Sequence, residues 1–328
     1  MDSAPQRATA FWTTAPGLGE LRCCELRAPA EGEALVRTLH SGISRGSETL
    51  VYHGQVPASV RDQMRAPFQD GDLPGPVKYG YLSVGLVEAG PPELAGHTVF
   101  CLYPHQDRYV VPAQALTPVP DGVPARRAVL AGTVETAVNA LWEAGPRLGD
   151  RIAVVGAGMV GLSVAALLRR FPLERLQLVD TDASKEPIAK AMGADFVSPA
   201  DAAGNCDLVI HCSASGQGLA RGLELLGGEG ELIEMSWYGD RQVQVPLGAA
   251  FHARRLSIRA SQVGVVAQSR RARRSTQDRL ALSLELLKDP VFDRLLTGSS
   301  AFSQLPRTME RLASGALPAL CHVIDYPD

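Results

Sequence analysis

A glycine-rich turn between two apolar segments constrains this chain more than any other feature. The stretch reads RIAVVGAGMVGLSVAALL, and its glycines are Gly156, Gly158 and Gly161. The first glycine permits a tight turn, the second lets a phosphate group approach the backbone, and the third lets a helix pack closely on a strand. A helix that starts here directs free N–H groups and its positive dipole end at an anion. The sequence therefore predicts a strand, turn and helix that bind the pyrophosphate of a dinucleotide.

A carboxylate downstream of this turn can distinguish the two nicotinamide dinucleotides. The strand expected at RLQLVD ends in Asp180, where folds of this kind carry the acid that binds a ribose 2′-hydroxyl. A carboxylate there repels the 2′-phosphate of NADP, so we expect NAD as the cofactor. Lys185 follows and is expected either to reach the adenosine ribose or to be a solvated lysine. The cofactor contacts expected from this region are Gly156, Gly158, Met159, Val160, Gly161, Asp180 and Lys185.

The arrangement of apolar segments predicts an α/β protein with two domains. Residues 1–120 contain short Val-rich runs separated by Gly and Pro, which indicate a β-rich domain. From Pro124, which can open a helix, strand and helix patterns alternate, and this alternation predicts a doubly wound parallel sheet. We expect residues 1–122 with 263–328 to form the first domain and residues 123–262 to form the nucleotide-binding domain. The long Pro- and Gly-rich segment 54–76 is expected to cap a pocket.

Composition excludes several classes of function. The formal net charge is -3 in 328 residues, and no apolar run approaches the length of a membrane helix. We therefore expect a cytoplasmic protein that binds neither nucleic acid nor membrane. The six cysteines include no C-x-x-C pair, which argues against a zinc ribbon or a disulfide framework. The arginine-rich segment SRRARRS is expected to be a solvated helix start, with binding of an acidic substrate or a subunit contact as alternatives.

Four stretches carry a resemblance to a known family. They read SGISRGSE, GYLSVGLVEAG, AGTVETAVNALW and VVGAGMVG, and they extend over nearly the full chain. In these stretches the chain resembles the medium-chain dehydrogenase/reductases, and the first stretch resembles a subgroup that includes the bacteriochlorophyllide dehydrogenases. The resemblance implies a GroES-like β-rich domain, a Rossmann domain, a small-molecule substrate and a homodimer.

The residues that bind zinc in many members of that family are replaced in this sequence. The Gly-His-Glu-x-x-Gly stretch of zinc-dependent members reads GYLSVG here, with Tyr81 for histidine and Leu82 for glutamate. The cysteine that is the first ligand falls on Ser44 or Arg45, and the four-cysteine structural zinc lobe is reduced to Cys101. Zinc polarises the substrate oxygen in those enzymes, so without zinc another group must do so. We expect no metal, as in the quinone and enoyl reductases of the family.

The resemblance and the chemistry of the side chains point to three catalytic candidates. Tyr81 replaces a metal ligand, so its phenol is expected to donate to the substrate oxygen or to handle the proton, unless it only fills the space of the metal. Ser47 matches a family hydroxyl that passes on the substrate proton, unless it only caps a helix. His105 is a candidate general acid, unless it is an ordinary core or surface histidine. Arg45 is expected to neutralise the pyrophosphate or an acidic substrate.

Further residues are expected around the substrate and the nicotinamide ring. Thr136 corresponds to a family residue that contacts the nicotinamide, and neighbouring Glu135 is expected to address the carboxamide or the substrate. Tyr103 and His105 fall where the zinc lobe is missing, so they are expected at the substrate opening. Trp237 and Tyr238 follow a parallel strand, where ligands gather, although core packing is the alternative. The predicted pocket comprises Ser44, Glu48, Tyr103, Glu135, Trp237 and Tyr238.

These observations predict a zinc-independent NAD(H)-linked oxidoreductase. The expected reaction interconverts an alcohol and a carbonyl on a small biosynthetic metabolite by hydride transfer, with the hydride carried by the nicotinamide. One alternative is an NAD(P)H-dependent reductase of activated C=C bonds, similar to the quinone and enoyl reductases. A second alternative is a non-catalytic member of the family, which binds the nucleotide but does not turn over a substrate.

Overall fold

The computed structural model describes residues 6–248 and 250–327, which form two compact units. Unit 1 holds the described residues up to Gly132, Leu284–Lys288 and those from Leu296 onward. Unit 2 holds the described residues of Thr133–Ser283 together with Asp289–Leu295. In this division residues 123–132 fall in unit 1, and residues 263–283 and 289–295 fall in unit 2.

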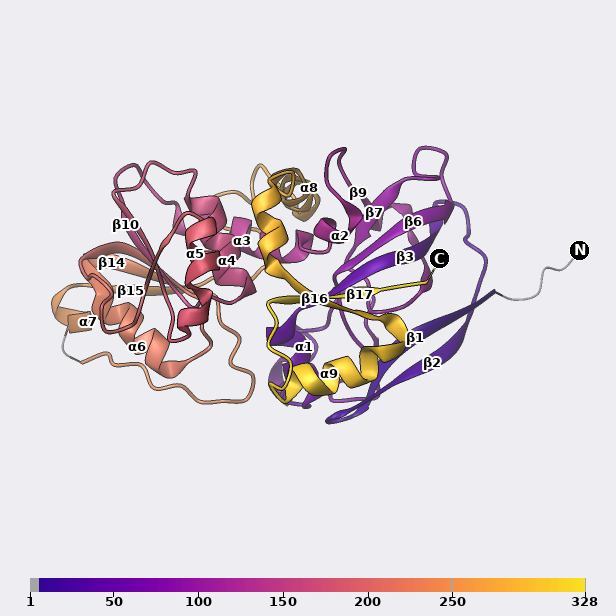
Figure 1. The fold of residues 1–328 in the computed structure, drawn as a ribbon, viewed down its shortest axis with the longest axis horizontal. Helices are drawn as coiled ribbons and strands as arrows, with labels where there is room; N and C mark the ends of the chain where they lie inside the picture. Colours follow the sequence, from indigo (N-terminus) through magenta and orange to yellow (C-terminus); the bar gives the residue numbers. More distant parts are fainter. Residues whose placement is uncertain (1–5, 249, 328) are drawn as a thin grey trace, which may run out of the picture. The chain divides into compact units, whose positions relative to one another are not determined.

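Unit 1 is built on a sheet whose strands come from both ends of the chain (Figure 1). Alternate residues of its strands face a core that includes Val36, Val87, Val99 and Tyr109, as period-2 patterning requires. The spatial order is β16 (Leu296–Ala301), β17 (Cys321–Asp325), β3 (Glu33–Ile43), β6 (Ser83–Ala89), β7 (Thr98–Cys101) and β9 (Thr117–Pro118), and β8 (Arg108–Pro112) pairs with β3.

A smaller sheet and several short helices complete unit 1. The sheet has the order β2 (Leu18–Leu26), β1 (Gln6–Ala15), β5 (Val77–Lys78) and β4 (Asp70–Gly71). The helices are α1 (Arg45–Tyr52), α2 (Ala125–Ala128) and α9 (Leu305–Ala313), with 3-10 turns η1 (Ala58–Val60), η2 (Ala113–Ala115) and η5 (Phe302–Gln304). Buried Leu305, Met309 and Leu312 of α9 share one face and pack on Phe11 and Ile43.

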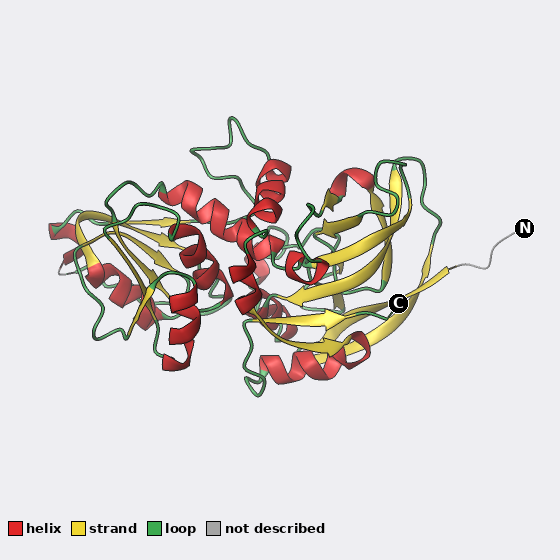
Figure 2. Cartoon of the chain, turned by 45° about the horizontal axis from the view of Figure 1, so that its top comes forward, coloured by secondary structure: helices red, strands yellow, loops and turns green. Residues whose placement is uncertain are grey.

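Unit 2 is a parallel sheet with helices on both faces (Figure 2). Its strand order is β12 (Asp195–Val197), β11 (Arg175–Val179), β10 (Arg151–Val155), β13 (Cys206–His211), β14 (Leu226–Glu234) and β15 (Ser257–Ala260). The helices are α3 (Ala131–Ala144), which begins in unit 1, α4 (Met159–Leu168), α5 (Glu186–Ala191), α6 (Gly216–Leu225), α7 (Ala250–Ala253) and α8 (Thr276–Leu286), with 3-10 turns η3 (Ala183–Lys185) and η4 (Pro290–Leu295). The predicted β-rich domain and doubly wound sheet are therefore confirmed.

A buried arginine explains why residues 263–283 belong to unit 2. Arg279 of α8 is 1% exposed, and its Nε atom donates to Glu135 Oε1 of α3 at 3.0 Å. The same guanidinium donates to Asn139 Oδ1 and to the Val263 carbonyl oxygen. These bonds hold α8 and the preceding loop against α3.

The helix expected from Pro124 is interrupted in the structure. α2 ends at Ala128, with Val129 as its C-cap, and α3 starts at Ala131. Apolar residues recur at helical spacing through both segments, because both segments bury their apolar side chains. None of the described helices is long and apolar enough to cross a membrane.

Candidate functional site

The predicted glycine turn lies at the carboxyl end of β10, and each glycine has a distinct steric role. Gly156 has a φ of +107°, and a Cβ there would lie 2.8 Å from the Cα of Ser213. A Cβ on Gly161 would lie 1.9 Å from the Gly156 carbonyl oxygen, so only glycine lets α4 pack so closely. Gly158, the N-cap of α4, faces open space instead. This open surface before a helix N-terminus fits the pyrophosphate of a dinucleotide.

Asp180 is fixed to the glycine turn from the neighbouring strand. It follows β11, and its Oδ2 accepts from the Ala157 backbone N–H at 2.6 Å. Its Oδ1 accepts from the Asp182 N–H at 2.9 Å. The carboxylate keeps further lone pairs for a ribose hydroxyl, because each oxygen accepts more than one hydrogen bond. Lys185, expected at the adenosine ribose, lies with its ammonium 3.8 Å from the Asp182 carboxylate.

A second polar cluster lies at the carboxyl ends of β13 and β14. His211 Nδ1 lies 2.9 Å from both carboxylate oxygens of Glu234, and His211 Nε2 lies 2.7 Å from Ser213 Oγ. The Tyr238 hydroxyl donates to Glu234 Oε2 at 3.1 Å. His211, Ser213 and Glu234 are not among the site residues predicted from the sequence. The rule that ligands gather beyond parallel strands points to the stretch HCSASG as well as to SWYGD.

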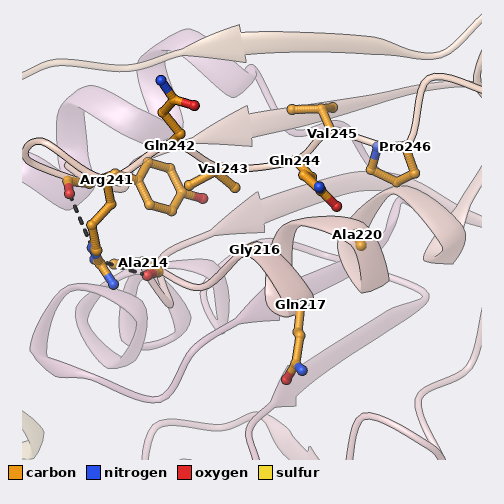
Figure 3. Close-up of a pocket in the computed structure, with 11 residues that line it drawn as sticks. Ala214, Gly216, Gln217, Ala220, Arg241, Gln242, Val243, Gln244, Val245 and Pro246 are labelled. Atoms are coloured by element: carbon orange, nitrogen blue, oxygen red, sulfur yellow. Dashed lines mark hydrogen bonds between the residues drawn. The ribbon is translucent and has the colours of Figure 1, made fainter.

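A cavity of about 770 Å³ lies beside this cluster, between the first turn of α6 and the segment after β14. Tyr238 lines it, and Arg241 donates to the carbonyl oxygens of Ala214 and Tyr238 (Figure 3). The Tyr238 ring also stacks toward His211, with the ring planes 20° apart. Tyr238 thus links the polar cluster to the cavity. Trp237, which was also predicted to line the pocket, is half-buried.

In unit 1 a buried chain of hydrogen bonds connects α1 to the large sheet. His105 Nε2 lies 2.8 Å from Glu48 Oε2, and His105 Nδ1 lies 2.7 Å from Ser41 Oγ. Ser41 Oγ lies 3.0 Å from the Tyr326 hydroxyl. The other Glu48 oxygen accepts from the Ser44 backbone N–H at 2.7 Å. Glu48 therefore ties the N-terminus of α1 to His105.

Tyr81 belongs to the same region as Ser44, the N-cap of α1, and Ser47 within that helix. The side chains of these two serines lower the pKa of the Tyr81 phenol. Burial and the nearby Glu48 carboxylate raise the pKa by more, to about 12. The Tyr81 side chain keeps part of its surface exposed. At neutral pH the structure thus presents a protonated phenol beside two serine hydroxyls.

Several predicted site residues have surroundings that differ from the expected ones. Tyr103 and His105 do not line an opening, because both are buried and Tyr103 stacks on Tyr109 with ring centroids 3.8 Å apart. Glu135 is buried and forms an ion pair with Arg279. Arg45 is exposed at the first residue of α1, and Thr136 is half-buried on α3.

The side chains at the family's zinc position do not fit a zinc ion. Leu82 offers no donor atom and is buried. A tyrosine ligand must lose its proton, which the raised pKa of Tyr81 opposes. Among residues 6–248 and 250–327, no three His, Cys, Asp or Glu side chains come together as metal ligands. Burial also raises the pKa of Cys101, to about 12.

Two curated relatives share part of the sequence, and no family model matches the chain. A D-guloside 3-dehydrogenase of Shigella flexneri is 26% identical over 200 residues, which are 56% of this chain and 57% of that protein. An alcohol dehydrogenase of Cupriavidus necator is 34% identical over 119 residues, 35% of this chain and 32% of that protein. The match thus spans little more than half of the first relative and a third of the second.

Solved structures match the whole chain. L-idonate 5-dehydrogenase from Escherichia coli has a TM-score of 0.81 and 16% identity, covering 98% of this chain and 99% of that one. A short chain alcohol dehydrogenase from E. coli CFT073 in complex with NADH has a TM-score of 0.76 and 15% identity, covering 97% and 99%. A Sinorhizobium meliloti 1021 protein bound to NADP has a TM-score of 0.76 and 16% identity, covering 98% and 99%. The chain therefore has the fold of these dehydrogenases, a GroES-like β-rich unit with a Rossmann unit.

Proposed function

We propose that the protein is an NAD(H)-linked oxidoreductase that interconverts an alcohol and a carbonyl on a small metabolite without a catalytic zinc ion. The observation that carries the proposal is the phenol of Tyr81, which stands near the Ser44 and Ser47 side chains where the resembling family has a zinc ligand, with a pKa raised to about 12. The glycine turn and Asp180 support the cofactor assignment. The alcohol and sugar dehydrogenases among the relatives support the reaction class.

The residues of unit 1 supply what the hydride chemistry of a bound nicotinamide requires. The nicotinamide, when bound, gives or takes the hydride. The Tyr81 O–H donates a hydrogen bond to the substrate oxygen and stabilises the negative charge that develops on it. The hydroxyls of Ser44 and Ser47 near the phenol offer a route for the proton. His105 and Glu48 position α1, because Glu48 binds the first N–H of that segment.

Asp180 is expected to set the preference for NAD over NADP. Replacing it by Asn removes the charge that repels a 2′-phosphate and one charge-assisted hydrogen bond, which is worth about 1.5–3 kcal/mol. We expect NADH to bind about tenfold or more weakly and NADPH to bind more tightly than to the unaltered protein. Fluorescence titration with both nucleotides measures this. Asp182→Asn changes a nearby carboxylate that faces Lys185 and should leave the preference unchanged. An unchanged preference in Asp180→Asn would contradict the assignment.

The experiment that tests the proposed function combines metal analysis with cofactor titration and a substrate panel. We expect purified protein to contain far less than one zinc per chain and to bind NADH more tightly than NADPH. Secondary alcohols should be oxidised with NAD. Stoichiometric zinc would show that Ser44, Tyr81 and Leu82 do not mark the metal position. Saturation of an enone without carbonyl reduction would favour a C=C reductase, and NADH binding without turnover across the panel would favour a non-catalytic role.

A further inference from the structure

Four polar side chains of unit 1 form one continuous hydrogen-bond chain. Glu48 Oε2 lies 2.8 Å from His105 Nε2, and His105 Nδ1 lies 2.7 Å from Ser41 Oγ. Ser41 Oγ lies 3.0 Å from the Tyr326 hydroxyl. Ser41 and His105 are 1% exposed, and Glu48 is 4% exposed. Burying ionisable side chains is costly, and apolar residues of similar volume often serve a fold equally well, so packing alone does not account for this hydrogen-bond chain.

The hydrogen-bond chain can carry a proton whichever ring nitrogen of His105 holds the hydrogen. A serine or tyrosine hydroxyl both donates and accepts, and a neutral imidazole has one nitrogen that donates and one that accepts. A proton that enters at one end therefore lets another leave at the other end, while each group exchanges a donated hydrogen bond for an accepted one. No heavy atom has to move, because all three separations are already hydrogen-bond distances.

The inner end of the hydrogen-bond chain lies beside Tyr81, the proposed donor to the substrate oxygen. Gly80 precedes Tyr81 with a φ of +134°, and a Cβ on Gly80 would lie 3.0 Å from the His105 ring. The imidazole thus packs directly on the backbone next to Tyr81. Burial raises the pKa of Tyr81, and the Glu48 carboxylate raises it further, which places this charge close to the phenol. The Glu48–His105 pair is therefore a neighbour of the group that handles the substrate proton.

The outer end of the hydrogen-bond chain lies just after β17. The Tyr326 ring stacks on Phe302, with ring centroids 4.4 Å apart. Burial raises the pKa of Tyr326, and the nearby Asp107 carboxylate adds to that rise. Tyr326 and Asp107 are both half-buried, whereas His105 and Ser41 are almost completely covered. The Tyr326 end of the hydrogen-bond chain is therefore the one nearer to solvent.

We propose that the hydrogen-bond chain from Glu48 to Tyr326 carries to solvent the proton that alcohol oxidation releases beside Tyr81. This inference rests on the proposed function. In that reaction the C–H bond breaks and the hydride leaves with its electron pair, the O–H electron pair forms the C=O bond, and the O–H proton stays with the protein. The phenol takes up this proton as it gives its own, through the nearby serine hydroxyls, to the Glu48–His105 pair. One proton then leaves from Tyr326 to water, and carbonyl reduction runs the same steps in reverse.

Proton exchange in the cofactor-free protein tests the hydrogen-bond chain without any turnover. Tyr326→Phe keeps the stacked ring and removes only the hydroxyl at the outer end, and Ser41→Ala interrupts the middle. With isotope-labelled histidine, NMR should show the His105 ring N–H exchanging with water at least about tenfold more slowly in both variants. The matched control is Tyr52→Phe, because the buried Tyr52 hydroxyl donates to the Gly17 carbonyl oxygen instead, and its exchange rate should be unchanged. Unchanged exchange in Tyr326→Phe and Ser41→Ala would overturn the inference.

A stopped-flow measurement links the hydrogen-bond chain to the reaction. A pH indicator in weak buffer follows proton release, while absorbance follows the NADH formed from a secondary alcohol. The two signals should rise together in the unaltered protein and in Tyr52→Phe. In Tyr326→Phe proton release should lag by about tenfold or more, and added imidazole, a small proton carrier, should shorten the lag. Proton release in step with NADH in Tyr326→Phe would overturn the inference. If the unaltered protein formed no NADH from any alcohol, the proposed function would fail, and the role of the hydrogen-bond chain in the reaction with it.

Discussion

Tyr81→Phe is expected to lower kcat about 100-fold, because loss of a single donor to a developing oxyanion has an effect of this order. Phenylalanine keeps the ring and its packing, and it removes only the hydroxyl, which stands near Ser44 and Ser47. Gly156, Gly158 and Asp180, the residues proposed to bind the nucleotide, belong to unit 2 and do not include this hydroxyl. The Kd for NADH should therefore stay within twofold, while turnover of a secondary alcohol falls.

The neighbouring tyrosine provides the control for this variant. Tyr79 packs edge-on against Tyr81, with ring centroids 6.0 Å apart, and Tyr79→Phe should change kcat by less than about threefold. Because the pKa of Tyr81 is about 12, its donor proton is retained as pH rises, and the Tyr81→Phe defect should be equally large at about pH 7 and pH 10. A Tyr81→Phe variant with full turnover would remove the phenol from the mechanism.

Arg279→Met is expected to produce the largest loss of stability, about 3–5 kcal/mol in the free energy of unfolding. Methionine leaves the Glu135 carboxylate buried without its partner, and Asn139 and the Val263 carbonyl lose a donor as well. Urea unfolding followed by tryptophan fluorescence measures the change. The double variant Arg279→Met with Glu135→Leu should recover much of the loss, since replacing both members of a buried pair by apolar residues is far less costly.

The pH dependence of this defect identifies its cause. Burial raises the pKa of Glu135, and Arg279 opposes that rise, so removing Arg279 raises the folded-state pKa further above the unfolded value. The folded variant then binds a proton that the unfolded chain has released, and its stability falls as pH rises through that window. The defect should be smaller at about pH 5 than at about pH 8. Lys190→Met, which breaks the exposed pair with Glu186, should leave the urea midpoint unchanged. A defect independent of pH would point to lost packing instead.

The glycine turn and the helix after it were predictable because their determinants are local. Gly156, Gly158 and Gly161 lie within one turn and the first residues of a helix, and steric limits on the backbone act over that same distance. Asp180 was predictable from its spacing, because the connection from β10 to β11 has a nearly fixed length in such folds. The β-rich and α/β regions followed from the period of the apolar residues.

The place of residues 263–283 in unit 2 depends on contacts between residues far apart in the sequence. Arg279 binds Glu135, 144 positions earlier, and the Ala267 N–H donates to Asn139 Oδ1, so this part of the chain is held on α3. A charged residue in an amphipathic helix pattern is usually solvated. Nothing local distinguishes Arg279 from the exposed arginines of the preceding segment.

The sequence by itself determined the glycine turn between strand and helix and the acid after the next strand, since both are visible in short motifs. Only the tertiary structure decided which polar side chains act together. It joined Glu48 to His105 and Ser41, and it joined His211 to Ser213 and Glu234. Hydrogen bonds depend on distances and angles that strand pairing and helix packing set across tens of residues, whereas a sequence motif records only the spacing along the chain.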